Sequence, residues 1–435
     1  MPMAWAGYEK KWRSVMIRKV KGTRDILPPE SRLWGVVEAE ARRIFEGFGY
    51  DEIRLPVMEP TELFVRTVGE GTDIVSKEMY TFADRKGRSL TLRPEGTAGV
   101  ARAFIENGLG QRPQPMRLSY MGPMFRYEKM QRGRYRQFSQ IGIELLGAST
   151  PQADVEVLLV LHTFLKALGF DDLVIVLNNL GDPEDRERFI EGLKKELLPD
   201  QEKLCGDCRR RWTENPLRIL DCKVPTCREL VAHTTPVADV VSDEARAHVD
   251  AVAEGLSDLE IPVRFAPRLV RGLDYYLRTV FEVISPALGE ETVICGGGRY
   301  DRLISDLGGR AVPGIGFAIG EDRLIDVLPD SFKHRVLDVP VVAVLPLGHE
   351  AAASALGLTV RLIEGGLRAP AEVTGRSLKA GLKWSNKIGA AVALILGPSE
   401  IAENNVLVRD LREGTQEIVA QDAVVEKVRR LLGIG

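Results

Sequence analysis

Two stretches of alternating side chains, residues 116–126 and 136–146, flank a short polar loop and constrain the fold more than any other pattern. Successive side chains of a strand point to opposite faces, so Gln140, Gly142 and Glu144 share one face while apolar residues fill the other. Two such strands joined by a loop predict a long hairpin within an antiparallel sheet. The polar face is either the floor of a cleft or a solvated surface.

The order of the remaining patterns predicts how the chain is divided. A buried strand is followed by a helical, charge-rich stretch, after which strand patterns return and a strand–helix alternation begins near the C-terminus. We therefore predict an α+β domain with an inserted helical domain, followed by a separate α/β domain with a mostly parallel sheet. The predicted parts are an N-terminal extension (1–15), the first part of the α+β domain (16–182), the inserted helical domain (183–267), the second part of the α+β domain (268–332) and the C-terminal domain (338–435).

The composition is that of an ordinary globular protein: of 435 residues, 59 are basic and 62 acidic, and 44% are hydrophobic. No run of about 18 apolar residues occurs, so we predict no membrane span. Charged residues interrupt the N-terminal stretch where a secretion signal needs an apolar core, and we expect a cytoplasmic protein. With a net charge of only −3, a nucleic-acid partner would have to be bound by local basic patches.

The sequence lacks the phosphate loop GxxxxGK[ST], the Rossmann motif GxGxxG and the hydrolase motifs HExxH and GxSxG. If the protein handles a nucleotide, arginine side chains must therefore bind the phosphates. The loop 126–136 carries five basic residues against one glutamate, although such a run is also typical of a solvated loop tip. Arg323 lies in the first turn of a predicted helix, where a cation opposes the helix dipole, which favours a role in ligand binding over capping.

Three further segments combine polar side chains with turns. LRPEGT (92–97) puts Glu95 between a strand and an apolar helix, either as a helix cap or as a carboxylate of a site. RGLDYY (271–276) is either an active-site loop or a structural turn. GGGRYD (296–301) follows a strand, and its three glycines suit a place where a ligand approaches the backbone closely.

The order of these motifs is more specific than any one of them. FRYEKMQRGRYRQFSQIGIELLG (125–147) resembles the second signature of class II aminoacyl-tRNA synthetases, and GIGFAIGEDRL (314–324) resembles the third. LVRGLDYY and CGGGRYD resemble two signatures peculiar to the histidyl-tRNA synthetase family, and KGTRDILPPE and GRSLKAGLKWSNKIGA also resemble segments of that family. The resemblance covers about residues 16–435.

The resemblance implies an enzyme that activates L-histidine with ATP and Mg²⁺ to histidyl-adenylate and transfers it to the 3′ end of tRNA(His). It also implies a six-stranded antiparallel catalytic sheet of the class II synthetase type, an inserted helical domain and a C-terminal α/β anticodon-binding domain. A homodimer is implied as well, with Pro56 in its weakly marked first signature.

Individual roles follow from the same resemblance. The residues implied in binding histidine are Glu95, Gly96, Thr97, Gln140, Glu144, Arg271, Tyr275, Tyr276 and Tyr300. The residues implied in binding ATP are Arg126 at the α-phosphate, Arg323 at the γ-phosphate, and Arg134. Arg126, Arg271 and Arg323 are the implied catalytic residues, with Arg271 stabilising the charge that develops on the α-phosphate. The sequence departs from the family at Asp322, usually Glu, and at Arg302, usually Gly.

A regulatory subunit that partners ATP phosphoribosyltransferase in histidine biosynthesis is the alternative function. That class resembles the catalytic domain only, lacks the C-terminal domain and loses the arginine of RGLDYY. Here Arg271 and the last domain are both present, which favours the synthetase. In that last domain Arg376, Lys379, Lys383 and Lys387 are spaced by three and four residues, so we predict that one helix face presents all four to tRNA.

Four of the five cysteines, Cys205, Cys208, Cys222 and Cys227, fall within 23 residues. A CxxC pair followed by a second pair at this distance is typical of a structural zinc site. The alternative is four reduced thiols that fill space in the inserted domain, and the resemblance does not decide between the two because the family's chemistry needs no such metal. A zinc ion here would hold the inserted domain together and stay away from catalysis.

Overall fold

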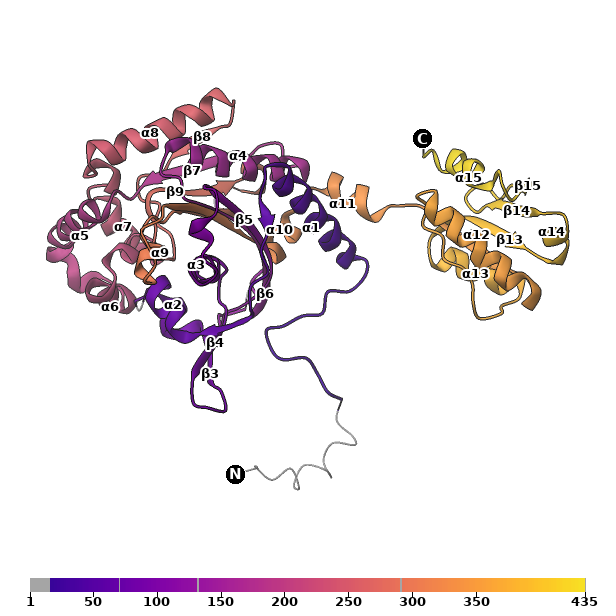
Figure 1. The fold of residues 1–435 in the computed structure, drawn as a ribbon, viewed down its shortest axis with the longest axis horizontal. Coiled ribbons are helices and arrows are strands. Elements are labelled where there is room, and N and C mark those ends of the chain that lie inside the picture. The colour runs from indigo at the N-terminus through magenta and orange to yellow at the C-terminus, as the bar shows by residue number, and fades with distance from the viewer. Residues whose placement is uncertain (1–15, 70, 131–132, 290–291, 435) are drawn as a thin grey trace, which may run out of the picture. The chain divides into compact units, whose positions relative to one another are not determined.

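Figure 1 shows the computed structural model, which describes residues 16–69, 71–130, 133–289 and 292–434. The predicted extension 1–15 lies outside the described residues. The chain divides into two compact units, one ending at Lys333 and the other beginning at His334. Within the described part of the chain, no helix combines the length and apolar character needed to cross a bilayer.

An eight-stranded sheet in the order β1-β5-β6-β11-β10-β9-β7-β8 forms the centre of the first unit. Its strands are β1 (Asp51–Glu52), β5 (Met116–Phe125), β6 (Gln137–Leu146), β7 (Val174–Asn179), β8 (Val263–Phe265), β9 (Leu277–Ile284), β10 (Val293–Arg299) and β11 (Gly314–Gly320). The predicted hairpin is β5–β6, and the six inner strands pair antiparallel with one another, as the class II resemblance implies. The short edge strands β1 and β8 add parallel pairs that were not predicted, because two or three residues give no alternation to detect.

Helices cover the apolar face of this sheet, as Figure 1 shows. They are α1 (Glu30–Gly47), α4 (Pro151–Ala167) and α8 (Asp243–Asp258). Phe45 of α1 contacts Phe164 of α4 and Phe317 of β11, with ring centroids 5.6 and 6.1 Å apart, and all three are buried. Because Phe317 pairs with Ile143, the apolar side of β6 lies under these helices and its polar side faces the opposite way.

A three-stranded antiparallel sheet and several shorter helices also belong to the first unit. Their bounds are β2 (Met58–Pro60), α2 (Thr61–Val68), η2 (Ile74–Glu78), β3 (Tyr80–Ala83), β4 (Ser89–Leu92), α3 (Thr97–Glu106), η3 (Leu109–Gln111), η7 (Pro286–Leu288), α9 (Leu303–Asp306) and α10 (Glu321–Val327). The strand–turn–helix read from LRPEGT is β4 followed by α3, and α10 follows β11 directly.

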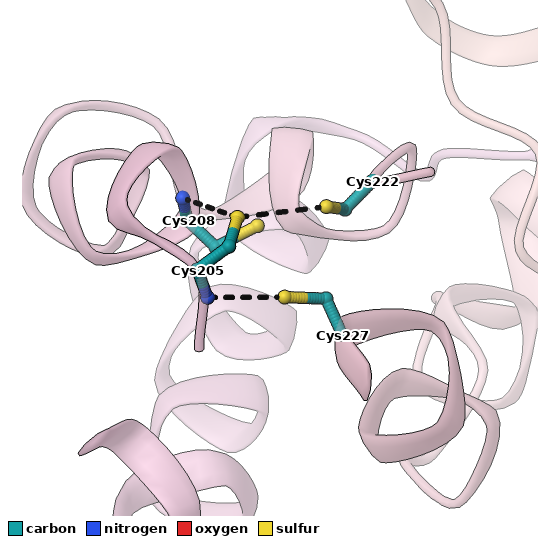
Figure 2. Close-up of side chains that lie close together, drawn as sticks. All are labelled: Cys205, Cys208, Cys222 and Cys227. Carbon is teal, nitrogen blue, oxygen red and sulfur yellow. Dashed lines mark hydrogen bonds between the residues drawn. The ribbon is translucent and has the colours of Figure 1, made fainter. Parts of the chain in front are cut away.

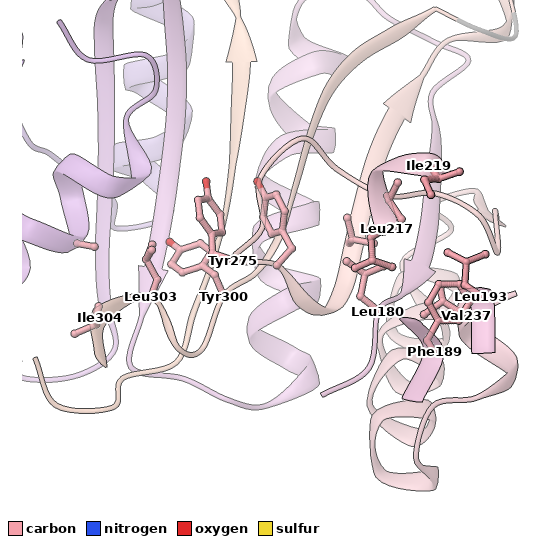
Figure 3. Packing of buried hydrophobic residues seen from close by; sticks show 14 of the residues in the cluster. Leu180, Phe189, Leu193, Leu217, Ile219, Val237, Tyr275, Tyr300, Leu303 and Ile304 are labelled. Atoms are coloured by element: carbon pink, nitrogen blue, oxygen red, sulfur yellow. The ribbon is translucent and has the colours of Figure 1, made fainter. Parts of the chain in front are cut away.

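The chain between β7 and β8 is a succession of helices. They are α5 (Pro183–Leu197), η4 (Leu198–Lys203), α6 (Gly206–Glu214), η5 (Pro216–Ile219), α7 (Pro225–Ala232), η6 (Val237–Asp239) and then α8. Their apolar residues join those around β9, β10 and α9 in one buried cluster (Figure 3). In that cluster Leu217 and Phe189 of the helical segment are continuous with Tyr275 and Tyr300 of the sheet domain.

The second unit contains β12 (Val341–Pro346), η8 (His349–Ala351), α12 (Ala352–Glu364), α13 (Leu378–Lys387), β13 (Ala390–Leu396), α14 (Pro398–Ala402), β14 (Asn405–Asp410), β15 (Gln416–Ala420) and α15 (Val424–Leu432), and α11 (Asp330–Leu337) leads into it. Its sheet has the order β12-β13-β14-β15. Strands β12 and β13 pair in parallel, but β14 pairs antiparallel with both β13 and β15. The predicted mostly parallel sheet is therefore wrong. The polar turn after Asp410 reverses the chain, and β14 and β15 therefore form an antiparallel hairpin.

Candidate active site

The polar face of the β5–β6 hairpin is buried, as expected for the floor of a candidate site. Tyr120 lies opposite Gly142, and Gln140 lies opposite Gly122 and Gly320 of the two neighbouring strands. A Cβ on Gly142 would stand 2.5 Å from the Tyr120 ring, so glycine is needed for that ring to lie against the sheet. Both Tyr120 and Gln140 are buried. Of the two alternatives for this face, the solvated surface is therefore excluded.

Glu95 is a helix cap and a buried carboxylate at the same time. Its oxygens accept hydrogen bonds from the backbone N–H groups of Thr97 and Ala98, at 2.7 and 2.9 Å. Burial raises the pKa of Glu95 above its ordinary value, although these two donors and the charge of Arg126 oppose the shift. The two sequence-based alternatives for this residue are thus compatible.

Glu144 is the second buried carboxylate of the floor. It accepts hydrogen bonds from Thr97 Oγ1 at 2.7 Å and from the Tyr300 hydroxyl. Burial raises the pKa of Glu144 to about 8, against the lowering effect of these two donors. A Cβ on Gly316 would overlap the Glu144 carboxylate, so that glycine makes room for it.

The tyrosines implied by the resemblance lie together beside these carboxylates. The ring centroid of Tyr275 is 4.8 Å from that of Tyr276 and 5.6 Å from that of Tyr300, both edge-on. A Cβ on Gly298 would stand 2.8 Å from the Tyr276 ring, and a Cβ on Gly296 would stand 2.7 Å from the Arg271 guanidinium. The glycine run, which suits the close approach of a ligand, also makes room for two side chains of the candidate site.

Three arginines from three separate segments border the site. Arg126, directly after β5, donates from Nε to the Pro94 carbonyl at 2.8 Å and lies over the Phe138 ring. Arg271 forms an ion pair with Glu282 of β9. Burial lowers the pKa of Arg271, but the Glu282 carboxylate contributes to a net rise above the ordinary value.

Arg323 is the third, in the first turn of α10 as the sequence predicts. Burial lowers the pKa of Arg323, and the positive charges of Arg134 and Arg271 lower it further, against the effect of Glu282. Cations gathered in this way repel one another, and a bound anion relieves that repulsion. The arrangement therefore suits a polyphosphate.

Comparison with known proteins agrees with this geometry. The sequence matches the family model described as histidyl-tRNA synthetase over residues 22–324 and the model described as anticodon binding domain over residues 341–431. The chain belongs to the histidyl-tRNA synthetase family. The resemblance stated from the motifs is thus confirmed.

Similarity to individual members of the family extends over nearly the whole chain. A histidine–tRNA ligase of Desulfatibacillum aliphaticivorans is 44% identical over 420 residues, which is 97% of this chain and 100% of that protein. One of Syntrophotalea carbinolica is 45% identical over 417 residues, 95% of this chain and 99% of that one. The apo crystal structure of S. aureus histidyl-tRNA synthetase has a TM-score of 0.77 at 34% identity and covers 95% of this chain and 99% of its own.

The alternative class shares the fold. An ATP phosphoribosyltransferase regulatory subunit/histidyl-tRNA synthetase from Bacillus halodurans has a TM-score of 0.63 at 24% identity, over 88% of this chain and 97% of that one. At this identity the likeness concerns the fold alone.

The remaining family positions lie at the edge of the site or outside it. Gly96 leaves room for Tyr120, whose ring a Cβ would meet at 2.2 Å. Arg134 is exposed and pairs with Glu128 at 3.4 Å, so it lies at the rim. Of the two departures from the family, Asp322 accepts hydrogen bonds from Arg24 and from the Ser139 N–H. The other, Arg302, is exposed and pairs with Asp306.

Two residues of the site were missed as candidates. Alternation along β5 gives the strand face of Tyr120, but only its register opposite Gly142 shows that its ring covers the floor. Glu282, the partner of Arg271, is a lone acid in the apolar strand TVFEVI, and that contrast was an available signal. Arg299 of GGGRYD serves the fold instead: it is fully buried and paired with Asp154.

The four clustered cysteines come together in the helical segment, as Figure 2 shows. Their sulfur atoms all lie within 4.8 Å of one another, and three of the four residues are buried.

In the second unit, Lys379, Lys383 and Lys387 are exposed on α13 at four-residue spacing. Arg376 does not join that helix face, because α13 begins at Leu378, and it lies instead beside Glu372 at 3.7 Å.

Proposed function

We propose that this protein activates L-histidine with ATP to histidyl-adenylate and transfers the histidyl group to the 3′ end of tRNA(His). The observation that carries the proposal is the site itself. Arg126, Arg271 and Arg323 come from three segments and border a buried floor of polar side chains. A small zwitterion fits such a floor, and a polyphosphate fits the cations at its border.

Histidine would be recognised at both of its ends. The Glu95 carboxylate and the side-chain oxygen of Gln140 suit its ammonium group, and that oxygen has no hydrogen-bond partner among the described residues. Glu144, with its pKa near 8, suits the imidazole ring: ionised it accepts the ring N–H, and protonated it donates to the unprotonated nitrogen. Tyr275, Tyr276 and Tyr300 would enclose the ring.

In the first step an oxygen of the histidine carboxylate attacks the α-phosphorus of ATP, and the bond to pyrophosphate breaks. The carboxylate is already ionised at neutral pH, so no general base is required. Two anions must approach each other, and the guanidinium groups of Arg126, Arg271 and Arg323 would offset their repulsion. Mg²⁺ would enter with ATP and neutralise phosphate charge, and Glu282 is a carboxylate beside the arginines that could hold it. In the second step a hydroxyl of the terminal ribose of tRNA attacks the histidyl carbonyl, and AMP leaves.

The parts outside the site support the rest of the proposal. The anticodon-binding domain would position tRNA(His) through the exposed lysines of α13. Val57, Met58 and Phe82 expose apolar side chains beside Pro56 and on the three-stranded sheet, and a homodimer would bury them. Since aminoacylation supplies protein synthesis, we place the enzyme in the cytoplasm.

ATP–pyrophosphate exchange with each of the standard amino acids tests the activation step, and charging of a tRNA(His) transcript tests the transfer. We expect histidine alone to drive exchange and tRNA(His) to be charged. Exchange with another amino acid would refute the substrate. Histidine binding with no exchange in correctly folded protein would favour the regulatory alternative.

A further inference from the structure

The four thiols of the inserted segment have the geometry of a metal site. A tetrahedral zinc ion with Zn–S bonds of about 2.3 Å has sulfur atoms about 3.8 Å apart. Here Cys205 Sγ and Cys222 Sγ are 3.9 Å apart, and all four sulfurs lie within 4.8 Å of one another (Figure 2). The measured separations are therefore close to those of a tetrahedral zinc site.

The surroundings of the cluster suit thiolates. The backbone N–H of Cys205 donates to Cys227 Sγ at 3.2 Å, and that of Cys208 donates to Cys205 Sγ at 3.5 Å. Such N–H donors stabilise negative charge on sulfur. Four thiolates around one Zn²⁺ leave a net charge of −2, and Arg211 is close enough to Cys208 and Cys222 to interact with that charge.

The four cysteines hold the two ends of the loop 205–222 together, and the middle of this loop contacts RGLDYY (271–276), called here the catalytic segment. Helix α6 begins directly after Cys205 and ends at Glu214, and the chain returns through η5 to Cys222. At the far end of this loop Asn215 donates from Nδ2 to Asp274 Oδ1 at 2.6 Å, and it is buried. Asp274 is the acid of RGLDYY, three residues after Arg271 and directly before Tyr275.

Other residues of the segment 205–227, called here the cysteine module, also contact elements next to the candidate site. Arg211 pairs with Asp73, directly before η2, at 3.1 Å. The Arg218 guanidinium lies 3.7 Å from the position of a Cβ on Gly272, within the catalytic segment. The apolar residues of the module belong to the same buried cluster as Tyr275 (Figure 3).

We propose that Cys205, Cys208, Cys222 and Cys227 bind one Zn²⁺ ion, and that this ion holds Asn215 in place to support the segment 271–276. The ion takes no part in the chemistry. Its effect reaches the site through the hydrogen bond from Asn215 to Asp274. This proposal is independent of the identity of the amino acid that the enzyme activates.

Elemental analysis of the full-length protein, purified with a reducing agent and without chelator, tests the binding. We expect about one zinc per chain, and a loss of at least five-fold in Cys208→Ser and Cys227→Ser. Cys295→Ser is the matched control, because this fifth cysteine is also buried but lies in β10, and it should keep its zinc. If a variant does not fold, removal of zinc from the wild type with a chelator and its return on adding ZnCl₂ give the same information. Zinc below 0.2 per chain that ZnCl₂ does not restore, iron in its place, or four thiols that titrate freely in the native protein would overturn the site.

Hydrogen exchange followed by mass spectrometry tests the coupling. Removal of zinc should speed exchange of the amides in 271–276 at least several-fold and leave β12 and β13 of the second unit unchanged. Asn215→Ala should speed exchange in the same segment while it retains zinc. If exchange in 271–276 is unaffected by complete loss of zinc, or by Asn215→Ala, the support of the catalytic segment is refuted.

Discussion

At the scale of single residues, Arg271 gives the clearest test of the site. Its ion pair with Glu282 and its close packing on Gly296 fix the position of its guanidinium. We expect Arg271→Ala to slow adenylate formation by about 10²–10³, which corresponds to about 3–4 kcal/mol, while histidine binding is nearly retained. Single-turnover adenylation and equilibrium binding of histidine separate the two effects. Arg246→Ala on the exposed side of α8 is the control. A fall of less than ten-fold would make Arg271 a structural residue.

Glu144 gives a residue-scale prediction about pH. Its pKa of about 8 in the native state lies above the ordinary 4.5, so the native state holds this proton more tightly than the unfolded chain does. Stability should therefore fall as the pH rises through this interval, with a contribution of up to about 1.4 kcal/mol per pH unit from this group. The free energy of unfolding, measured in urea between pH 5 and about 8, should lose this pH dependence in Glu144→Gln. Glu187→Gln, at an exposed position, is the control and should retain it. An unchanged slope in Glu144→Gln would show that Glu144 is ionised in the native protein.

At the scale of elements, the glycine run of β10 lies close to the backbone of the neighbouring strand β11. A Cβ on Gly297 of β10 would stand 2.1 Å from the Gly316 carbonyl oxygen of β11, and a backbone atom cannot move aside easily. We expect Gly297→Ala to lower the free energy of unfolding by about 1–3 kcal/mol or to prevent folding. Gly320→Ala is the matched control at the end of β11, where a Cβ meets nothing within 4 Å. Equal urea midpoints for the two variants would contradict this account of the glycine run.

At the scale of the whole molecule, the two compact units should divide the reaction between them. A chain that ends at Asp338 should retain ATP–pyrophosphate exchange and lose at least ten-fold in tRNA charging. Replacement of Lys379, Lys383 and Lys387 by alanine in the full chain should raise the KM for tRNA, and most strongly at low salt, because phosphate contacts weaken as salt increases. Unchanged charging by the truncated chain would remove tRNA binding from the second unit.

The sequence by itself determined the elements and the motifs that lie on them. Alternation over 116–126 and 136–146 predicted the hairpin and the polar face with Gln140 and Glu144, because the two-residue period of a strand is a local property. The tertiary structure alone decided what depends on register and on contacts between distant segments. These include the ring of Tyr120 over Gly142, the pairing of Arg271 with Glu282, and the contact of Asn215 with Asp274. Such contacts join residues whose spacing along the chain carries no period, so no local pattern could predict them. The mixed sheet of the second unit was missed for the same reason, since the order of strands fixes neither their direction nor their neighbours.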